Sequence, residues 1–325
     1  MMSMKRIGLF CSGGDAPGMN AAIRAVVRTA VFHRMEVVGI LRGYKGMIDG
    51  SFRPLGARSV SGIISRGGTI LHTARSPEFM SYKGRKKAYE QLKNTGIEGL
   101  VAIGGDGTFR GAHRFTSEFD LPVIGVTGSI DNDCWGTDYT LGFDTAVNIA
   151  LDAIDRIRDT AASHDRIFFV EVMGRKSGMI ALWSGLAGGA EAIFIPEVRE
   201  DLPAVAREIV EGRKKGKTSA IVVVAEGEEE GDAFQIARKF RKLTKLDYRV
   251  TILGHIQRGG APTAFDRILG TRSGVAAVEA LRSGKRNMMV GIQNGRMVLI
   301  PFSKMWNRSK RPDLSWLKIA EMMSI

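Results

Sequence analysis

The chain alternates short apolar runs rich in β-branched residues with segments of helix length. Such runs are typical of strands buried on both faces of a parallel sheet. We predict strands at residues 7–11, 37–41, 100–103, 123–126, 167–173, 192–195, 220–225 and 250–253. Helices are expected in the intervals, most clearly at 21–32 and 145–158. The 325 residues are enough for two domains, so we predict an α/β fold with two doubly wound, Rossmann-like parallel-sheet domains.

The segment 21–32 has apolar residues at helical spacing, which predicts an amphipathic helix packed against a sheet. We expect Asp15 to cap the N-terminus of this helix. Pro17 is expected in its first turn, where the missing N–H is harmless.

The formal net charge of +13 admits two explanations, nucleic-acid binding or anionic small substrates. The second is favoured because basic residues are scattered and aromatic residues, which would stack on bases, make up only 7%. One compact basic cluster, residues 213–217, is either a phosphate patch or a solvated helix end. Cys11 and Cys134 are expected to be reduced thiols of a cytoplasmic enzyme. Apolar runs are too short for a signal-peptide core or a membrane span.

Two loops that follow apolar runs combine glycine, hydroxyl and carboxyl groups, at residues 104–108 and 128–133. Glycines let backbone N–H groups approach phosphate oxygens, and Asp supplies the hard oxygen ligand that Mg²⁺ requires. Because loops at the carboxyl ends of parallel strands are where open α/β sheets bind ligands, the two loops predict a Mg-phosphate site. Asp131 and Asp133 are expected to point in different directions, so that one accepts a substrate proton and the other binds Mg²⁺ directly or through water. The alternative is that these side chains cap the following turn.

Other strand ends carry polar residues at 12–15, 174–178, 226 and 254–260. Their number favours a binding role over simple turns, and His255 beside Arg258 suggests an anion site. Residues 212–218 imitate a Walker A loop, but Glu211 stands where glycine is needed and a strand follows rather than precedes. Residues 105–111 imitate a dinucleotide fingerprint with one residue too many.

Five motifs, in order along nearly the whole chain, resemble ATP-dependent 6-phosphofructokinases of the short bacterial type. They occupy residues 12–20, 104–108, 129–133, 173–175 and 254–260. The pentapeptide at 104–108 is also found in NAD kinases and lipid kinases, whereas the combination is specific. Three departures stand out: Thr127-Gly128-Ser129 replaces Pro-Gly-Thr, Met80 replaces a basic residue, and 53–58 aligns imperfectly.

The resemblance implies transfer of the γ-phosphoryl group of MgATP to the 1-hydroxyl of fructose 6-phosphate. Asp131 is then the general base, while Asp106 binds Mg²⁺ with Asp133 nearby. The catalytic set is Asp131, Ser129, Arg175, Arg75 and Gly14. The ATP set is Gly13, Gly14, Tyr44, Arg75, Ser76, Asp106, Gly107, Thr108 and Gly111. The sugar-phosphate set is Ser129, Asp131, Met173, Gly174, Arg175, Glu226, His255 and Arg258, with Arg166 and Arg249 from a neighbouring subunit.

The resemblance also implies a homotetramer with the active site between two domains in each chain. The ATP domain is expected at 1–142 plus 257–306, and the fructose 6-phosphate domain at 143–256 plus 307–325. An effector site for ADP or phosphoenolpyruvate is expected at Arg24, Arg28, Arg58, Arg158, Glu191, Lys215 and Lys217. Ala57, not Arg58, aligns with an arginine of relatives, which would alter effector strength.

The donor is expected to be ATP because Gly107 and Gly128 leave room for the inner phosphates, where pyrophosphate-using relatives place Asp and Lys. The competing classes are an NAD or lipid kinase, a sugar-phosphate-binding regulator without turnover, and a basic nucleic-acid binder. Residues 254–260 argue against the other kinases, and Asp131 with Arg175 argues against a mere binder. No nucleic-acid or membrane partner is expected.

Overall fold

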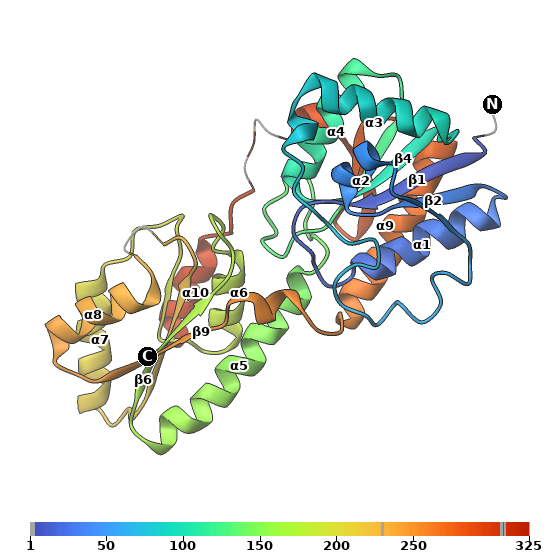
Figure 1. Cartoon of the computed structure of the whole chain (residues 1–325). Helices are drawn as coiled ribbons and strands as arrows, with labels where there is room; N and C mark the ends of the chain where they lie inside the picture. The colour runs from blue at the N-terminus through green and yellow to red at the C-terminus, as the bar shows by residue number, and fades with distance from the viewer. Residues whose placement is uncertain (1–3, 229–230, 306–307, 309, 325) are drawn as a thin grey trace. The chain divides into compact units, whose positions relative to one another are not determined.

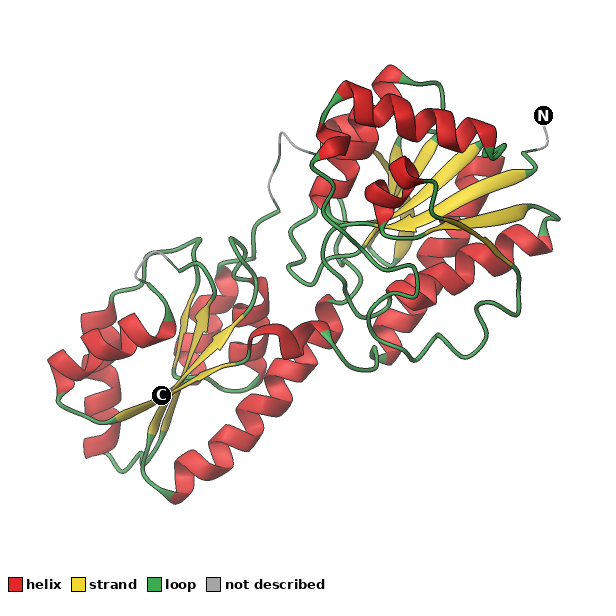
Figure 2. Cartoon of the chain, in the orientation of Figure 1, coloured by secondary structure: helices red, strands yellow, loops and turns green. Residues whose placement is uncertain are grey.

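The computed structural model describes residues 4–228, 231–305, 308 and 310–324. The chain divides into two compact units, each built on its own sheet flanked by helices (Figure 2). Unit 1 comprises Met1–Asp144 and Arg258–Lys310, and unit 2 comprises Thr145–Gln257 and Arg311–Ile325. The expected junction between residues 306 and 307 lies outside the described residues. Which ligand each unit binds remains a prediction.

Unit 1 contains a seven-stranded sheet of order β11-β10-β5-β4-β1-β2-β3. Its strands are β1 Arg6–Cys11, β2 Glu36–Ile40, β3 Phe52–Leu55, β4 Gly99–Gly104, β5 Val123–Thr127, β10 Met288–Gln293 and β11 Arg296–Pro301. The five inner strands are mutually parallel, and the two edge strands β3 and β11 run antiparallel to their neighbours. The sequence predicted β1, β2, β4 and β5, whereas it missed both edge strands and β10.

The helices of unit 1 cover both faces of this sheet (Figure 1). They are α1 Met19–Phe32, α2 Gly43–Asp49, α3 Tyr82–Asn94, α4 Asp106–Glu118 and α9 Ala264–Arg282, with short 3₁₀ turns η1 Glu78–Met80 and η3 Phe302–Lys304. Helices α1 and α9 pack together, and Gly274 allows the close approach because a Cβ there would lie 2.7 Å from the Ala22 carbonyl oxygen. On the other side, α2, α3 and α4 bury an aromatic cluster that includes Phe79, Phe109 and Phe115.

The predicted start of α1 is wrong. The residue before the helix is Gly18 in a left-handed conformation (φ 98°), with no side-chain cap, so Asp15 does not cap α1 and Pro17 lies before it. A Cβ on Gly18 would meet the Asp266 carbonyl oxygen at 3.2 Å, within the tight packing against α9. A glycine turn therefore starts the helix, because this backbone shape and this space exclude other residues.

Unit 2 contains four parallel strands in the order β7-β8-β6-β9. The strands are β6 Ile167–Val172, β7 Ala192–Phe194, β8 Ala220–Ala225 and β9 Tyr248–Ile252, and all four were predicted. The helices are α5 Phe143–Ser163, α6 Met179–Ala187, α7 Leu202–Lys214, α8 Ala233–Thr244 and α10 Ser315–Met323, with the 3₁₀ turn η2 Gly254–Arg258. Helices α7 and α8 share one apolar core with the sheet, and α6 contacts α10. Among the described residues, no helix has the length and apolar character needed to cross a membrane.

Candidate functional site

The loops that follow β1, β4 and β5 lie side by side at the carboxyl edge of the unit 1 sheet. The Ser12 N–H donates to the Ile103 carbonyl (3.0 Å), and the Gly128 N–H donates to the Gly104 carbonyl (2.9 Å). Across the loops, the Thr108 hydroxyl donates to the Ser12 carbonyl (3.0 Å). The three glycine-containing loops that the sequence singled out in this unit are thus tied together, at the edge where parallel sheets bind ligands.

The space around three glycines of these loops differs, as the surroundings of an added Cβ show. At Gly104, a Cβ would lie 2.4 Å from the Ser12 carbonyl oxygen, so the approach of two loops demands glycine. At Gly107, a Cβ would meet no protein atom within 4 Å, as expected if this space receives a ligand. At Gly128, a Cβ would lie 2.7 Å from the Met19 methyl group. The expected open space therefore exists at Gly107, whereas at Gly128 an added Cβ would require the end of the Met19 side chain to move.

The run from Asp131 to Asp133 is organised around Asn132, which is fully buried and left-handed (φ 50°). The Asn132 Oδ1 accepts a hydrogen bond from the Thr140 N–H (3.1 Å), eight residues further along the chain, so this side chain braces the loop internally. Asp131 is only 5% exposed, whereas Asp133 is exposed and accepts a hydrogen bond from the Ser129 hydroxyl (3.2 Å). The two carboxylates therefore occupy different environments, as roles in proton transfer and in metal binding would require.

Negative charge gathers around this run. Burial raises the pKa of the Cys134 thiol well above its usual range, and the charges of Asp133, Asp106 and Asp131 raise it further. Lys310 partly offsets them, although burial lowers its own pKa to about 8. In the described ranges no three His, Cys, Asp or Glu side chains gather as a metal site. Asp106 and Asp133 still suit Mg²⁺, which is usually bound by one or two carboxylates together with waters and substrate phosphates.

The remaining predicted ATP residues differ in accessibility. Tyr44 is buried, donates its hydroxyl to the Thr108 carbonyl (2.6 Å) and stacks on Phe79, so in this structure it supports the start of α4. Burial also raises the pKa of Tyr44 above its usual range. Gly111 lies against the Tyr44 ring, where an added Cβ would sit 3.0 Å away. Arg75 is exposed and Ser76 half-buried, before η1.

The β1–α1 loop is also contacted by a predicted sugar-phosphate residue. The Arg258 guanidinium donates to the Asp15 carbonyl (3.0 Å), and a Cβ on Gly14 would lie 2.7 Å from its Nη1. Gly13 is left-handed (φ 86°), which turns the loop after β1. Arg258 is therefore held beside the predicted ATP loop, within the same unit.

In unit 2, several predicted sugar-phosphate residues meet at the carboxyl ends of β6 and β8. Met173 follows β6 and donates its N–H to the Gln257 side-chain oxygen (2.9 Å), while the Glu226 N–H donates to the Val172 carbonyl (2.8 Å). Gln257 is fully buried, and sequence reasoning did not single it out as a site residue. The Glu226 Oε2 is buried and accepts no hydrogen bond from any described residue. The structure thus leaves one carboxylate oxygen available for a donor outside the chain.

Other predicted sugar-phosphate residues are exposed or lie elsewhere. Gly174 and Arg175 have positive φ angles (148° and 55°), and Arg175 and His255 are exposed. Arg166 directly precedes β6, and Arg249 is the second residue of β9, paired with Phe168. Both arginines therefore lie toward the opposite end of the strands from Glu226. The structure of this chain alone does not bring them to the predicted pocket.

The predicted effector residues divide between the units. Arg24 and Arg28 share a face of α1, and Arg58 is exposed in the same unit. In unit 2, Arg158 lies 3.9 Å from Glu191, and Glu191 lines a small cavity together with Lys217. The Lys217 ammonium donates to the Ser324 carbonyl. A larger cavity of about 610 Å³ beside it is lined in part by Lys215 and Lys217. The basic cluster at 213–217 therefore borders cavities.

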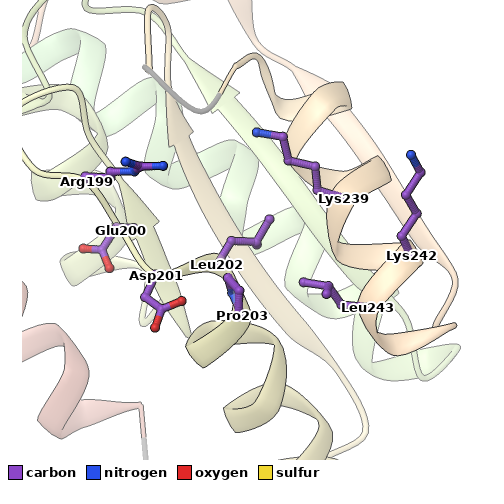
Figure 3. Close-up of a pocket in the computed structure, with 8 residues that line it drawn as sticks. All are labelled: Arg199, Glu200, Asp201, Leu202, Pro203, Lys239, Lys242 and Leu243. Carbon is purple, nitrogen blue, oxygen red and sulfur yellow. The ribbon is translucent and has the colours of Figure 1, made fainter.

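Unit 2 also has a cavity of about 670 Å³ that the sequence did not predict (Figure 3). Its walls carry both charges, from Arg199, Lys239 and Lys242 on one hand and Glu200 and Asp201 on the other. Asp201 caps α7 by accepting from the Ala204 N–H (3.2 Å). Burial, with nearby acids, raises the pKa of Glu200. No predicted site residue lines this cavity.

Two α/β units with glycine loops and carboxylates at the ends of parallel strands are typical of enzymes that act on phosphorylated substrates. Comparison with known proteins identifies the family. The family described as Phosphofructokinase matches residues 6–281, and the chain belongs to this family. This confirms the resemblance of the five motifs and sets aside the other kinases and the nucleic-acid binder.

Individual relatives cover the whole chain. It is 58% identical over 322 residues to ATP-dependent 6-phosphofructokinase 1 of Thermus thermophilus, covering 99% of this chain and 100% of that protein. Identity to the ATP-dependent 6-phosphofructokinase of Halalkalibacterium halodurans is 52%, with the same coverage. Among solved structures, phosphofructokinase from Saccharomyces cerevisiae matches with a TM-score of 0.88 and 36% identity. That match covers 98% of this chain and 46% of the yeast chain.

Proposed function

We propose that the chain transfers the γ-phosphoryl group of ATP to the 1-hydroxyl of fructose 6-phosphate, giving fructose 1,6-bisphosphate and ADP. The relatives named ATP-dependent 6-phosphofructokinase support this over the full length. The structural observation that carries it is the tie between the loops after β1, β4 and β5, with Asp131 buried beside them. This reaction would place the enzyme in glycolysis, in the cytoplasm.

In this proposal Asp131 accepts the proton of the sugar hydroxyl as the hydroxyl attacks the phosphoryl group. Its burial favours this role because a hydrogen bond from the reacting hydroxyl to this carboxylate is stronger where water is excluded. Ser129 and the backbone N–H groups of Gly13 and Gly14 bind the transferring phosphoryl oxygens, and Arg75 and Arg175 stabilise their charge. These residues contribute mainly through positioning and electrostatics, the chief needs of phosphoryl transfer.

Mg²⁺ fits the carboxylate pair Asp106 and Asp133. Asp106 and Asp133 would supply hard carboxylate oxygens to the ion, and neither side chain is fully buried, which leaves them accessible to water and to a phosphate-bearing ligand. Bound there, Mg²⁺ would neutralise charge on the phosphates of ATP. The half-exposed Asp106 side chain also accepts a hydrogen bond from Arg110 (2.8 Å), which holds it at the first turn of α4.

Fructose 6-phosphate would bind unit 2, and ATP unit 1. Glu226 supports the sugar assignment because its buried Oε2 suits a sugar hydroxyl donor. Met173 and His255 are the further sugar-phosphate residues proposed in this unit, with Gly174 supplying a turn. Arg258, which lies in unit 1, is also proposed as a phosphate ligand. Since Arg166 and Arg249 lie toward the other end of their strands, we propose a homotetramer in which they bind the phosphate group of the fructose 6-phosphate held by a neighbouring subunit.

A second site would bind ADP or phosphoenolpyruvate as effectors. Its support is the neighbourhood of Arg158 and Glu191 and the cavities beside Lys215 and Lys217. Arg24, Arg28 and Arg58 of unit 1 would contribute from a neighbouring subunit. Because Ala57 rather than Arg58 aligns with an arginine of relatives, we propose that effector strength differs from theirs.

The direct test is a coupled assay of fructose 1,6-bisphosphate formation from fructose 6-phosphate, run in parallel with MgATP and with magnesium pyrophosphate. We expect turnover with ATP and little with pyrophosphate. Glucose 6-phosphate serves as the acceptor control, since its C1 is not a primary alcohol. Turnover with pyrophosphate and none with ATP would contradict the proposed donor, and turnover with neither would contradict the reaction.

A further inference from the structure

Two residues far along the sequence, Arg308 and Lys310, contact the loop that follows β5. The Lys310 ammonium donates to the Asn132 Oδ1 (2.8 Å) and to the Asp138 carbonyl (2.6 Å), across 178 and 172 residues. The Arg308 guanidinium lies 4.6 Å from the centre of the Trp135 ring. These contacts fall on residues 132–138 of that loop, directly after Asp131.

Lys310 contacts the residue on which the shape of this loop depends. Asn132 has a left-handed backbone, a conformation that costs a non-glycine residue on the order of 1 kcal/mol and persists only where the surroundings impose it. Its amide is held at both ends, because Oδ1 accepts from the Thr140 N–H (3.1 Å) and Nδ2 donates to the Asp138 carbonyl (3.3 Å). Lys310 donates to both acceptors in this arrangement and so closes it.

The neighbours of Asn132 in the chain are the two carboxylates of the proposed site. A rotation of the Asn132 backbone would re-aim Asp131 and Asp133 together, because the peptide on each side is shared. A displacement of 1 Å of a reacting group can cost on the order of 100-fold in rate. The bonds that fix Asn132 are therefore well placed to control catalysis, without touching a substrate.

We propose that Lys310 is a positioning residue for phosphoryl transfer, which acts through Asn132 to hold Asp131 and Asp133 in their working orientations. The inference rests on the proposed function, which gives these two aspartates their roles. A merely structural role would be to anchor the chain against this loop, and Arg308 offers the matched case, since its guanidinium packs on the Trp135 ring of the same loop rather than on Asn132.

The test compares Lys310→Met, Lys310→Arg and the control Arg308→Met by kcat, by KM for each substrate and by Tm. We expect Lys310→Met to lower kcat by about 10- to 100-fold while both KM values change less than about threefold, the pattern of lost positioning rather than lost binding. Lys310→Arg keeps a cationic donor and should recover much of kcat. Arg308→Met should keep kcat within about twofold, whatever its effect on Tm.

A further variant, Lys310→Cys, separates the ammonium group from the rest of the side chain. Aminoethylation of the new thiol rebuilds an ammonium at nearly the original distance, and it should raise kcat toward wild type. Cys11 and Cys134 are buried, so wild-type protein treated in the same way is the control. Wild-type kcat in Lys310→Met, or equal losses of kcat in Lys310→Met and Arg308→Met, would overturn the inference alone. Absence of turnover in the wild-type chain would overturn the proposed function and this inference with it.

Discussion

Replacing Gly107 by Asp tests whether the nucleotide phosphates lie against the start of α4. Gly107 is the second residue of α4 and is exposed, and a Cβ there would meet no protein atom within 4 Å. The variant should therefore fold without strain. An acidic residue in the first turn stabilises a helix by about 0.3–1 kcal/mol, and removing a helical glycine contributes about 0.5–1 kcal/mol more. We expect Tm to hold or rise.

The effect on ATP use should be large and of opposite sign. A carboxylate about 5 Å from a phosphate charge costs about 3 kcal/mol at an effective dielectric constant near 20. Since 1.36 kcal/mol is tenfold, kcat/KM for ATP should fall by roughly 150-fold in Gly107→Asp. The KM for fructose 6-phosphate should change little, because the new charge lies at the start of α4, which carries none of the proposed sugar-phosphate residues.

The assay measures kcat/KM for ATP at saturating fructose 6-phosphate, together with Tm. Gly107→Asn is the matched control, equal in size to Asp but neutral, and Gly107→Ala removes glycine alone. If Gly107→Asn loses as much as Gly107→Asp, bulk rather than charge is responsible. Wild-type kcat/KM for ATP in Gly107→Asp would refute the placement of the phosphates.

Three further predictions test the base, the fold and the regulation. Asp131→Asn should lower kcat by about 10²- to 10⁴-fold with KM for the sugar kept, and near-normal kcat would locate the base elsewhere. Arg85→Met leaves the 13%-exposed Glu118 without its main partner and should cost about 3 kcal/mol, or roughly 6–12 °C in Tm. Because Arg85 lowers the pKa of Glu118, the ion pair stabilises the fold above the ordinary Glu pKa, and this stabilisation is lost as the pH falls through the lowered pKa. The difference in Tm between wild type and Arg85→Met should therefore become smaller in acid. An equal difference at all pH values would contradict the role of the ion pair. In the wild type, phosphoenolpyruvate or ADP should shift the apparent affinity for fructose 6-phosphate by roughly 5- to 150-fold, corresponding to about 1–3 kcal/mol of coupling, and the double variant Arg24→Ala/Arg158→Ala should abolish this shift. Wild-type saturation curves that superimpose with and without the effector would refute the site.

The inner strands of unit 1 other than β10 were predictable because a strand buried on both faces must be continuously apolar. The missed strands obey different rules. β3 is a four-residue edge strand containing Pro54, which the sheet interior would not accept. β10 and β11 form a hairpin around Asn294-Gly295, both with positive φ, and this dipeptide is a strong hairpin signal that a search for alternating strands and helices passes over. A separate scan for turn dipeptides would have found it.

The candidate site divides in the same physical way. Each glycine loop is contiguous and follows its strand directly, so its functional groups can be identified from a short stretch of sequence. The contacts that shape the loops are not local: Lys310 reaches Asn132 across 178 residues, and Gln257 reaches Met173 across 84. A lysine near a chain end and a glutamine within a turn carry no sequence pattern that predicts these bonds. Sequence can therefore nominate groups that meet the substrate, whereas the residues that hold those groups in place emerge only when the folded chain brings distant segments together.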